Sequence, residues 1–216
     1  MISDLNKHRF EYIWHLYYNK ITDKDLSFTE HTPCDPSVWQ FPKHLVEWHR
    51  LVFGLGHKSL KDKEVLDIGC GMAWYLGNME NIVKKYVGID PNEESIKYAR
   101  MMTNIVDMDA DVSVMDGQDV TCKADTIISL GVLHQIHPFE RVQSILERFD
   151  CENVILDCWE QKNGVHVNDI MNYLIENKGF VLTERHQYHY AGKDDAGKNQ
   201  INEGDRYVLH FDRQAV

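Results

Sequence analysis

The sequence predicts an α/β fold: an open, mostly parallel seven-stranded sheet with helices on both faces, a C-terminal antiparallel hairpin and an N-terminal helical extension. Two observations predict it. From residue 64 to residue 179, short runs rich in Val, Ile and Leu alternate with amphipathic segments of helical period, the pattern of a parallel sheet covered on both faces. Two further strand-like runs then follow with a polar, glycine-containing stretch between them, which predicts a hairpin.

The N-terminal part differs in character, and we expect residues 1–58 to form a helical cap and residues 59–216 a separate domain. Residues 1–32 carry aromatic side chains at helical spacing, Trp14 and Tyr17 among them, and 31–37 is a break with two prolines. A second amphipathic helix is expected from Ser37, ended by Gly54 and Gly56.

The remaining elements follow in order. Expected strands cover 64–69, 86–90, 111–117, 125–131 and 153–158. Expected helices cover 73–85, 92–103, 138–148 and 167–179. The last two strands, 180–190 and 206–211, are joined by a loop.

Composition limits the class of function. Lys and Arg number 23 against 34 Asp and Glu, a formal charge of −11, which disfavours a broad nucleic-acid surface. No run approaches the length of a membrane span, and the N-terminus does not resemble a signal peptide. Five cysteines at irregular spacing give no disulfide framework. We therefore expect a cytoplasmic protein of unknown oligomeric state.

The stretch "VLDIGCGMAW", 65–74, ends a predicted strand in a glycine-rich turn. Gly69 and Gly71 fit the start of the dinucleotide fingerprint, but Trp74 stands where the third glycine is needed for close helix packing. Asp90 follows Gly69 by the roughly 20 residues that place a ribose-binding acid. The turn therefore predicts a nucleoside site without a pyrophosphate grip.

Four motifs in order, "VLDIGCG", "VGIDP", "VMDGQD" and "DTIISLGVLHQI", closely resemble the class I S-adenosylmethionine-dependent methyltransferases. The resemblance covers residues 64–160, implies a Rossmann-like fold and agrees with the terminal hairpin. The segment "SLGVLHQIHP" is also somewhat similar to the tRNA wobble-uridine carboxymethyltransferase branch, which uses a carboxylated form of the cofactor. The acidic charge argues against tRNA.

The resemblance implies that S-adenosyl-L-methionine is the cofactor. It also implies the binding residues, which are Asp67, Gly69, Cys70, Gly71, Met72, Asp90, Pro91, Asp116, Gly117, Leu130 and Gly131. Asp67 would lie near the ammonium group, although it could merely cap the turn. Asp90 would hold the ribose.

The resemblance implies that Asp116 accepts from the adenine amino group, with Gln118 or Asp119 beside it. Asp119 and Asp111 are the alternatives for this role. Leu130 and Gly131 would offer backbone carbonyls to the ammonium group.

Histidines are the candidate catalytic groups. His134 follows the fourth expected strand, where a substrate pocket is expected, and its ordinary pKa would let it accept a proton near neutrality. A loop histidine bonded to the backbone is the alternative, and His137 is nearby. A metal site is also conceivable at His186, His189 and His210, but no ligand spacing supports one, so we expect no metal.

The acceptor pocket is expected over the ends of the fourth and fifth strands, and Asp157, Trp159 and Glu160 can shape it. The Cys34 segment, "TPCD", predicts only a structural thiol. We expect transfer of a methyl group to an O, N or S nucleophile of a small molecule. A tRNA-modifying (carboxy)methyltransferase and a non-catalytic cofactor-binding protein are the alternatives.

Overall fold

A computed structural model describes residues 50–73, 75–160, 165–188, 191–193, 199–201 and 206–214. The aromatic segment expected to form the first helix therefore lies outside the described residues, as do Cys34, Trp74 and His189. The division into 1–58 and 59–216 stays a prediction. Its boundary falls inside the short helix α3, His57–Leu60.

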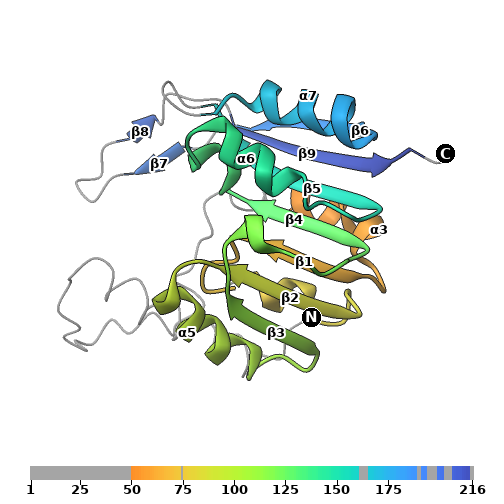
Figure 1. Ribbon diagram of the computed structural model, residues 1–216. Coiled ribbons are helices and arrows are strands. Elements are labelled where there is room, and N and C mark those ends of the chain that lie inside the picture. Colours follow the sequence, from red (N-terminus) through yellow and green to blue (C-terminus); the bar gives the residue numbers. More distant parts are fainter. Residues whose placement is uncertain are drawn as a thin grey trace.

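A seven-stranded sheet forms the centre of the molecule, in the order β3-β2-β1-β4-β5-β9-β6 (Figure 1). Its strands are β1 Glu64–Ile68, β2 Lys85–Asp90, β3 Asp109–Val114, β4 Thr126–Leu130, β5 Asn153–Trp159, β6 Phe180–Tyr188 and β9 Arg206–Arg213. Strands β1 to β5 pair in parallel, and β9 runs antiparallel to both of its neighbours, β5 and β6. The expected α/β sheet with its C-terminal antiparallel hairpin is confirmed.

Side chains of alternating parity divide the interior into two hydrophobic cores, one on each face of the sheet. Val65 and Ile128 belong to one core, and their neighbours Leu66 and Ile127 belong to the other. The first core is covered by η1 Arg50–Leu55, α3, α4 Leu76–Met79 and α5 Glu93–Thr103. The second is covered by α6 Phe139–Leu146 and α7 Val167–Lys178.

The helix expected over 73–85 is wrong, because only Leu76–Met79 is helical. Ala73 and Asn81 adopt positive φ angles of 55° and 66° on either side of it, and Gly77 lies inside it, where glycine weakens a helix. The amide of Asp62 also donates to the carbonyl of Ile82 at 2.8 Å. The chain thus turns early and returns directly to β2.

Two smaller differences concern the loop and the glycines. The loop expected before β9 contains a two-stranded sheet, β7 Ala191–Lys193 paired with β8 Asn199–Ile201. Gly54 lies within η1, a π-helix, instead of ending a helix. Leu51, Val52 and Phe53 of η1 pack into the first core.

Candidate functional site

The glycine turn after β1 is tied to the end of β2. The amides of Gly69 and Cys70 both donate to the carbonyl of Ile89, at 2.9 and 3.0 Å. The amide of Gly71 donates to Oδ2 of Asp90 at 3.0 Å. Two predicted cofactor-binding segments, which are separate in the sequence, therefore form one structural unit at the carboxyl edge of the sheet.

The two glycines of this turn have different surroundings. Gly69 and Gly71 have φ angles of 78° and 54°, in the left-handed region that favours glycine. A Cβ built on Gly69 would lie 2.4 Å from Cγ2 of Val132, in the loop after β4. A Cβ built on Gly71 would meet no atom within 4 Å. Gly69 thus packs against protein, whereas Gly71 faces open space where a ligand can approach the backbone.

Asp90, at the end of β2, is held by backbone amides. Its Oδ2 accepts from Gly71 and its Oδ1 accepts from the amide of Asn92 at 2.8 Å. Each carboxylate oxygen can accept more than one hydrogen bond, so the fixed carboxylate can still receive both hydroxyls of a ribose. Pro91 is exposed next to it, and Asn92 caps α5.

Asp67, on β1, is a buried carboxylate that is only 1% exposed. Burial raises its pKa to about 7; the hydrogen bond from Tyr86 opposes this effect, and the charge of Asp90 adds to it. The hydroxyl of Tyr86 donates to Oδ2 of Asp67 at 2.7 Å. Within the described part of the chain neither Asp67 nor Asp90 forms an ion pair, and a cationic ligand suits such a pair of carboxylates.

The predicted adenine-binding segment is well ordered by its own contacts. Oδ1 of Asp116 accepts from the amide of Gln118 at 3.1 Å, and Oδ2 pairs with the guanidinium of Arg141. A Cβ on Gly117 would lie 3.0 Å from Ile68, so this segment packs closely on β1. Asp111 bonds the neighbouring amide of Val112 on the edge strand β3. The alternatives among these acids therefore stay open.

The remaining predicted cofactor residues can contribute through their backbone. Cys70 and Met72 are 3% and 2% exposed, and their side chains belong to the first core. Leu130 is buried at the end of β4. The carbonyl of Gly131 accepts from the side-chain amide of Gln135, so one of its two lone pairs is already used.

His134 stands in a column of side chains over the ends of β4, β5 and β9. It belongs to the short helix η3, Leu133–Gln135, and is fully buried. Its ring stacks on Trp159, with ring centroids 5.1 Å apart and planes inclined by 26°. The guanidinium of Arg206 lies 3.2 Å from the centroid of the Trp159 ring and 6.0 Å from that of Tyr188.

This column presents buried polar atoms whose hydrogen-bonding capacity is unused. Neither ring nitrogen of His134 has a hydrogen-bond partner among the described residues, and the same holds for Nε1 of Trp159. Burial, and secondarily the charge of Arg206, lower the pKa of His134 to about 4. The expectation that His134 titrates near neutrality is therefore wrong, since the ring is neutral at physiological pH.

The other candidates after β5 divide into two groups. Asp157 is 4% exposed and accepts a hydrogen bond of 2.8 Å from the hydroxyl of Tyr188. Glu160 instead pairs with His166 and accepts from the amide of Val167, so it caps the start of α7. Asp157 thus faces the buried column, whereas Glu160 has a structural contact.

The histidines considered for a metal do not converge in the described part of the chain. His186 contacts Glu184 at 2.9 Å, and Nε2 of His210 contacts the carbonyl of Leu51 at 2.9 Å. No group of three potential metal ligands occurs among the described residues. His137 is exposed.

Sequence reasoning missed Arg206, Tyr188, Tyr86 and Val132. Arg206 and Tyr188 flank the hairpin segment, where no sequence signal places them beside β5. Tyr86 does carry a signal: it is an aromatic residue in a predicted parallel strand, and Asp67 lies on the neighbouring strand opposite Gly88, two positions further along.

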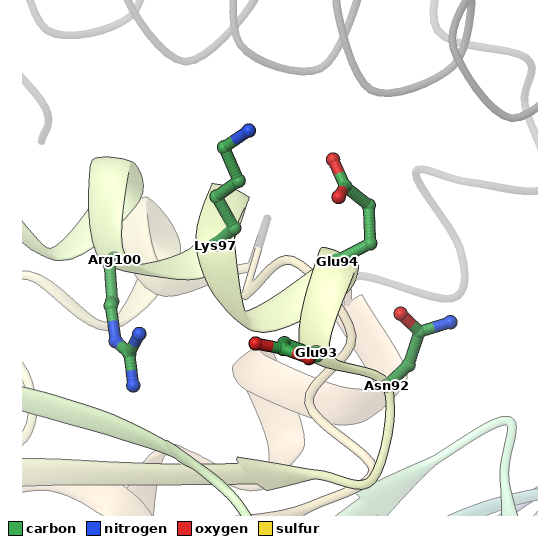
Figure 2. A pocket seen from close by; sticks show the side chains of 5 residues that line it. All are labelled: Asn92, Glu93, Glu94, Lys97 and Arg100. Atoms are coloured by element: carbon green, nitrogen blue, oxygen red, sulfur yellow. The ribbon is translucent and has the colours of Figure 1, made fainter.

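A hollow lies along α5 (Figure 2), lined by Asn92, Glu93, Glu94, Lys97 and Arg100. In that view Lys97 and Glu94 point to one side of the helix, and Arg100 points to the other. Its side chains belong to one helix and carry charges of both signs.

Comparison with known proteins agrees with this geometry. Residues 43–151 match the family model described as "Methyltransferase domain". The chain is 28% identical over 171 residues to a tRNA U34 carboxymethyltransferase of Campylobacter fetus, covering 67% of this chain and 61% of that protein. It is 35% identical over 107 residues to the protein of the same name from Sulfurimonas denitrificans, covering 47% of this chain and 36% of that protein.

Among solved structures, the N-methyltransferase NodS from Bradyrhizobium japonicum WM9, in complex with S-adenosyl-L-homocysteine, superposes with a TM-score of 0.62 at 15% identity. The match covers 80% of this chain and 86% of NodS. At this identity the likeness concerns the fold.

The chain therefore belongs to the methyltransferase domain family, and its fold is that of the S-adenosylmethionine-dependent methyltransferases. The expected family and fold are confirmed. The chain spans 61% of one tRNA-enzyme relative and 36% of the other. Among the described residues, no helix has the length and apolar character needed to cross a membrane.

Proposed function

We propose that the protein transfers a methyl group from S-adenosylmethionine to an O, N or S atom of a small molecule bound over the ends of β4 and β5. The bound cofactor supplies an electrophilic methyl group on a sulfonium. Asp67 would attract the cationic amino-acid end, Gly71 would let the backbone approach, and Asp90 would accept from the ribose. These assignments follow from the burial, charge and free space described above.

The observation that carries the acceptor site is the column of His134, Trp159 and Arg206. It lies at the same edge of the sheet as the glycine turn, and Val132 joins the two, since it packs on Gly69 and caps η3. The positive charge of Arg206 and the Nε1–H of Trp159, which has no partner among the described residues, favour an anionic group on the acceptor. A planar acceptor with an acidic substituent fits such a site.

His134 would orient the acceptor more than deprotonate it. A neutral imidazole with a pKa of about 4 donates through one nitrogen and accepts through the other, but it is a weak base. Methyl transfer from a sulfonium needs alignment and exclusion of water above all. A buried, stacked ring provides a fixed hydrogen-bonding group for that alignment.

The proposal is tested by measuring methyl transfer to a panel of small aromatic and heteroaromatic acids with labelled S-adenosylmethionine. Arg206→Met should lower turnover of acidic acceptors at least tenfold and leave S-adenosylhomocysteine affinity within about twofold. Arg185→Met is the matched control, because Arg185 also stacks on an aromatic ring, 4.6 Å from the centroid of Tyr207. Equal effects of both variants would contradict an acceptor site at Arg206.

Carboxymethyl transfer to tRNA is the second candidate, and two observations favour it. Both sequence relatives described above are named tRNA U34 carboxymethyltransferases, and the guanidinium of Arg206 suits a carboxylate on the cofactor as well as one on the acceptor. The net charge of −11 disfavours a polyanion. The two functions separate by donor and acceptor: only the second predicts preference for carboxy-S-adenosylmethionine and product on tRNA.

A further inference from the structure

Tyr86 lies beneath the glycine turn in a buried polar cluster with Asp67 and Cys70. Tyr86 is 1% exposed, and its hydroxyl donates to Oδ2 of Asp67 at 2.7 Å. The thiol of Cys70 contacts the carbonyl of Gly71 at 3.5 Å. These three groups come from β1, β2 and the turn between β1 and α4.

Gly88 makes room for this cluster. A Cβ built on Gly88 would lie 2.9 Å from the hydroxyl oxygen of Tyr86 and 2.9 Å from Sγ of Cys70. Any larger residue at position 88 would push on the phenol or the thiol. The sequence of β2 thus combines a large side chain at Tyr86 with no side chain at Gly88. This combination leaves room for the phenol beneath Asp67.

We propose that Tyr86 is a positioning residue that keeps the Asp67 carboxylate ionised and oriented toward the cationic amino-acid end of the cofactor. This inference rests on the proposed function, because it concerns the same cofactor site. It adds a residue outside the glycine turn and outside the predicted cofactor-binding set.

The charges around Asp67 explain why a donor is needed. Burial penalises the ionised carboxylate, and the negative charge of Asp90 opposes it further. Tyr86 offsets part of this penalty. The pKa of Tyr86 is itself raised well above its ordinary value, mainly by burial, so the phenol keeps its proton and always donates. Burial also raises the pKa of Cys70, so the neighbouring thiol adds no charge.

The test is the pH dependence of S-adenosylhomocysteine binding by calorimetry between pH 5.5 and 8.5. A protonated Asp67 cannot pair with the ligand's ammonium group, so wild-type affinity should fall towards tenfold per pH unit below a midpoint near 7. Tyr86→Phe should raise that midpoint by about one pH unit and weaken binding about fivefold at pH 7. Its affinity should approach the wild-type value at pH 8.5.

Two further variants separate this role from a general loss of packing. Tyr98→Phe removes a hydroxyl from another buried tyrosine of the same core, and it should leave the midpoint unchanged. Asp67→Asn should bind weakly with no midpoint in this range. If the wild type shows the midpoint and Tyr86→Phe does not move it, the positioning role of Tyr86 is overturned but the proposed function is not. No S-adenosylhomocysteine binding by the wild type at any pH overturns the proposed function.

Discussion

The imidazole of His134 stacks on the indole of Trp159, with 5.1 Å between the ring centroids, although 25 positions separate the two residues in the sequence. The contact joins the turn after β4 to the end of β5. The neutral imidazole is therefore fixed in place by an aromatic surface instead of by hydrogen bonds. Both ring nitrogens lack a hydrogen-bond partner among the described residues.

Replacing His134 by Phe should separate its catalytic effect from its packing. His134→Phe keeps an aromatic ring on Trp159 and removes both nitrogens, so turnover should fall about tenfold or more. The pH profile between 6.5 and 8 should keep its shape, because the pKa of His134 lies near 4. Steady-state rates across this range provide the measurement, and a limb that disappears near pH 7 would contradict the assignment.

The same variant should change acid stability. The pKa of His134 is lowered from 6.5 to about 4 on folding, so the unfolded chain binds more protons than the native protein between these values. Stability is consequently lost as the pH falls through this window. Between pH 7 and pH 5 the free energy of unfolding should fall in both proteins. The fall should be smaller in His134→Phe than in the wild type, by roughly 1–3 kcal/mol. Urea unfolding at the two pH values measures the difference.

Alanine at the two turn glycines should have different consequences. Gly69→Ala places a Cβ 2.4 Å from Val132, so it should lower the melting temperature by several degrees. Gly71→Ala meets no neighbouring atom; its main penalty without ligand is the left-handed φ, about 1 kcal/mol. It should nevertheless abolish the thermal shift that S-adenosylhomocysteine produces in the wild type. A full shift in Gly71→Ala would show that the turn is not the binding loop.

Asp90→Ala should weaken S-adenosylhomocysteine binding at least tenfold. The loss leaves ribose hydroxyls without acceptors, worth roughly 1–3 kcal/mol, and frees the amide of Gly71 that Asp90 now holds. Asp109→Ala, an exposed carboxylate at the first position of the edge strand β3, is the matched control, and its affinity should match that of the wild type. Calorimetry at pH 8 measures both variants, and equal affinities in the two would remove Asp90 from the site.

Asp67 should make the ligand-free protein less stable as the pH rises. Its pKa increases from 3.8 in the unfolded chain to about 7 in the native protein, so the native state binds more protons between these values. Stability therefore declines from about pH 4 to pH 7 because of this group. Asp67→Asn should flatten the decline and raise the melting temperature at pH 8, although it weakens cofactor binding. If Asp67→Asn and the wild type show the same dependence of stability on pH, Asp67 is already ionised across this range in the native protein.

Strands were easier to predict from the sequence than helices. The runs at β1, β2, β4 and β5 are continuous and apolar, because buried parallel strands contact protein on both faces. The segment 73–85 misled because its apolar spacing is helical, whereas Asn81 and Ala73 take left-handed angles. Local backbone preference outweighed periodicity there.

The meeting of the glycine turn with Asp90 was predictable for a related reason, since the turn after each parallel strand lies at the same end of the sheet. The acceptor side was harder. Arg206 follows a polar segment of no regular pattern, and only the antiparallel pairing of β9 with β5 brings it opposite Trp159. The pKa of His134 was equally hidden, because burial that depends on distant elements determines it.

The position of β9 has a consequence for the order in which the molecule assembles. This strand is the last of the sheet in the sequence, yet it lies between β5 and β6. A ribosome-bound chain that has exposed everything up to β6 therefore still lacks the strand that carries Arg206. We expect nascent chains of this length to form the glycine turn before the column of His134, Trp159 and Arg206. Arrested chains should therefore bind S-adenosylhomocysteine while the indole of Trp159 is still accessible to fluorescence quenchers.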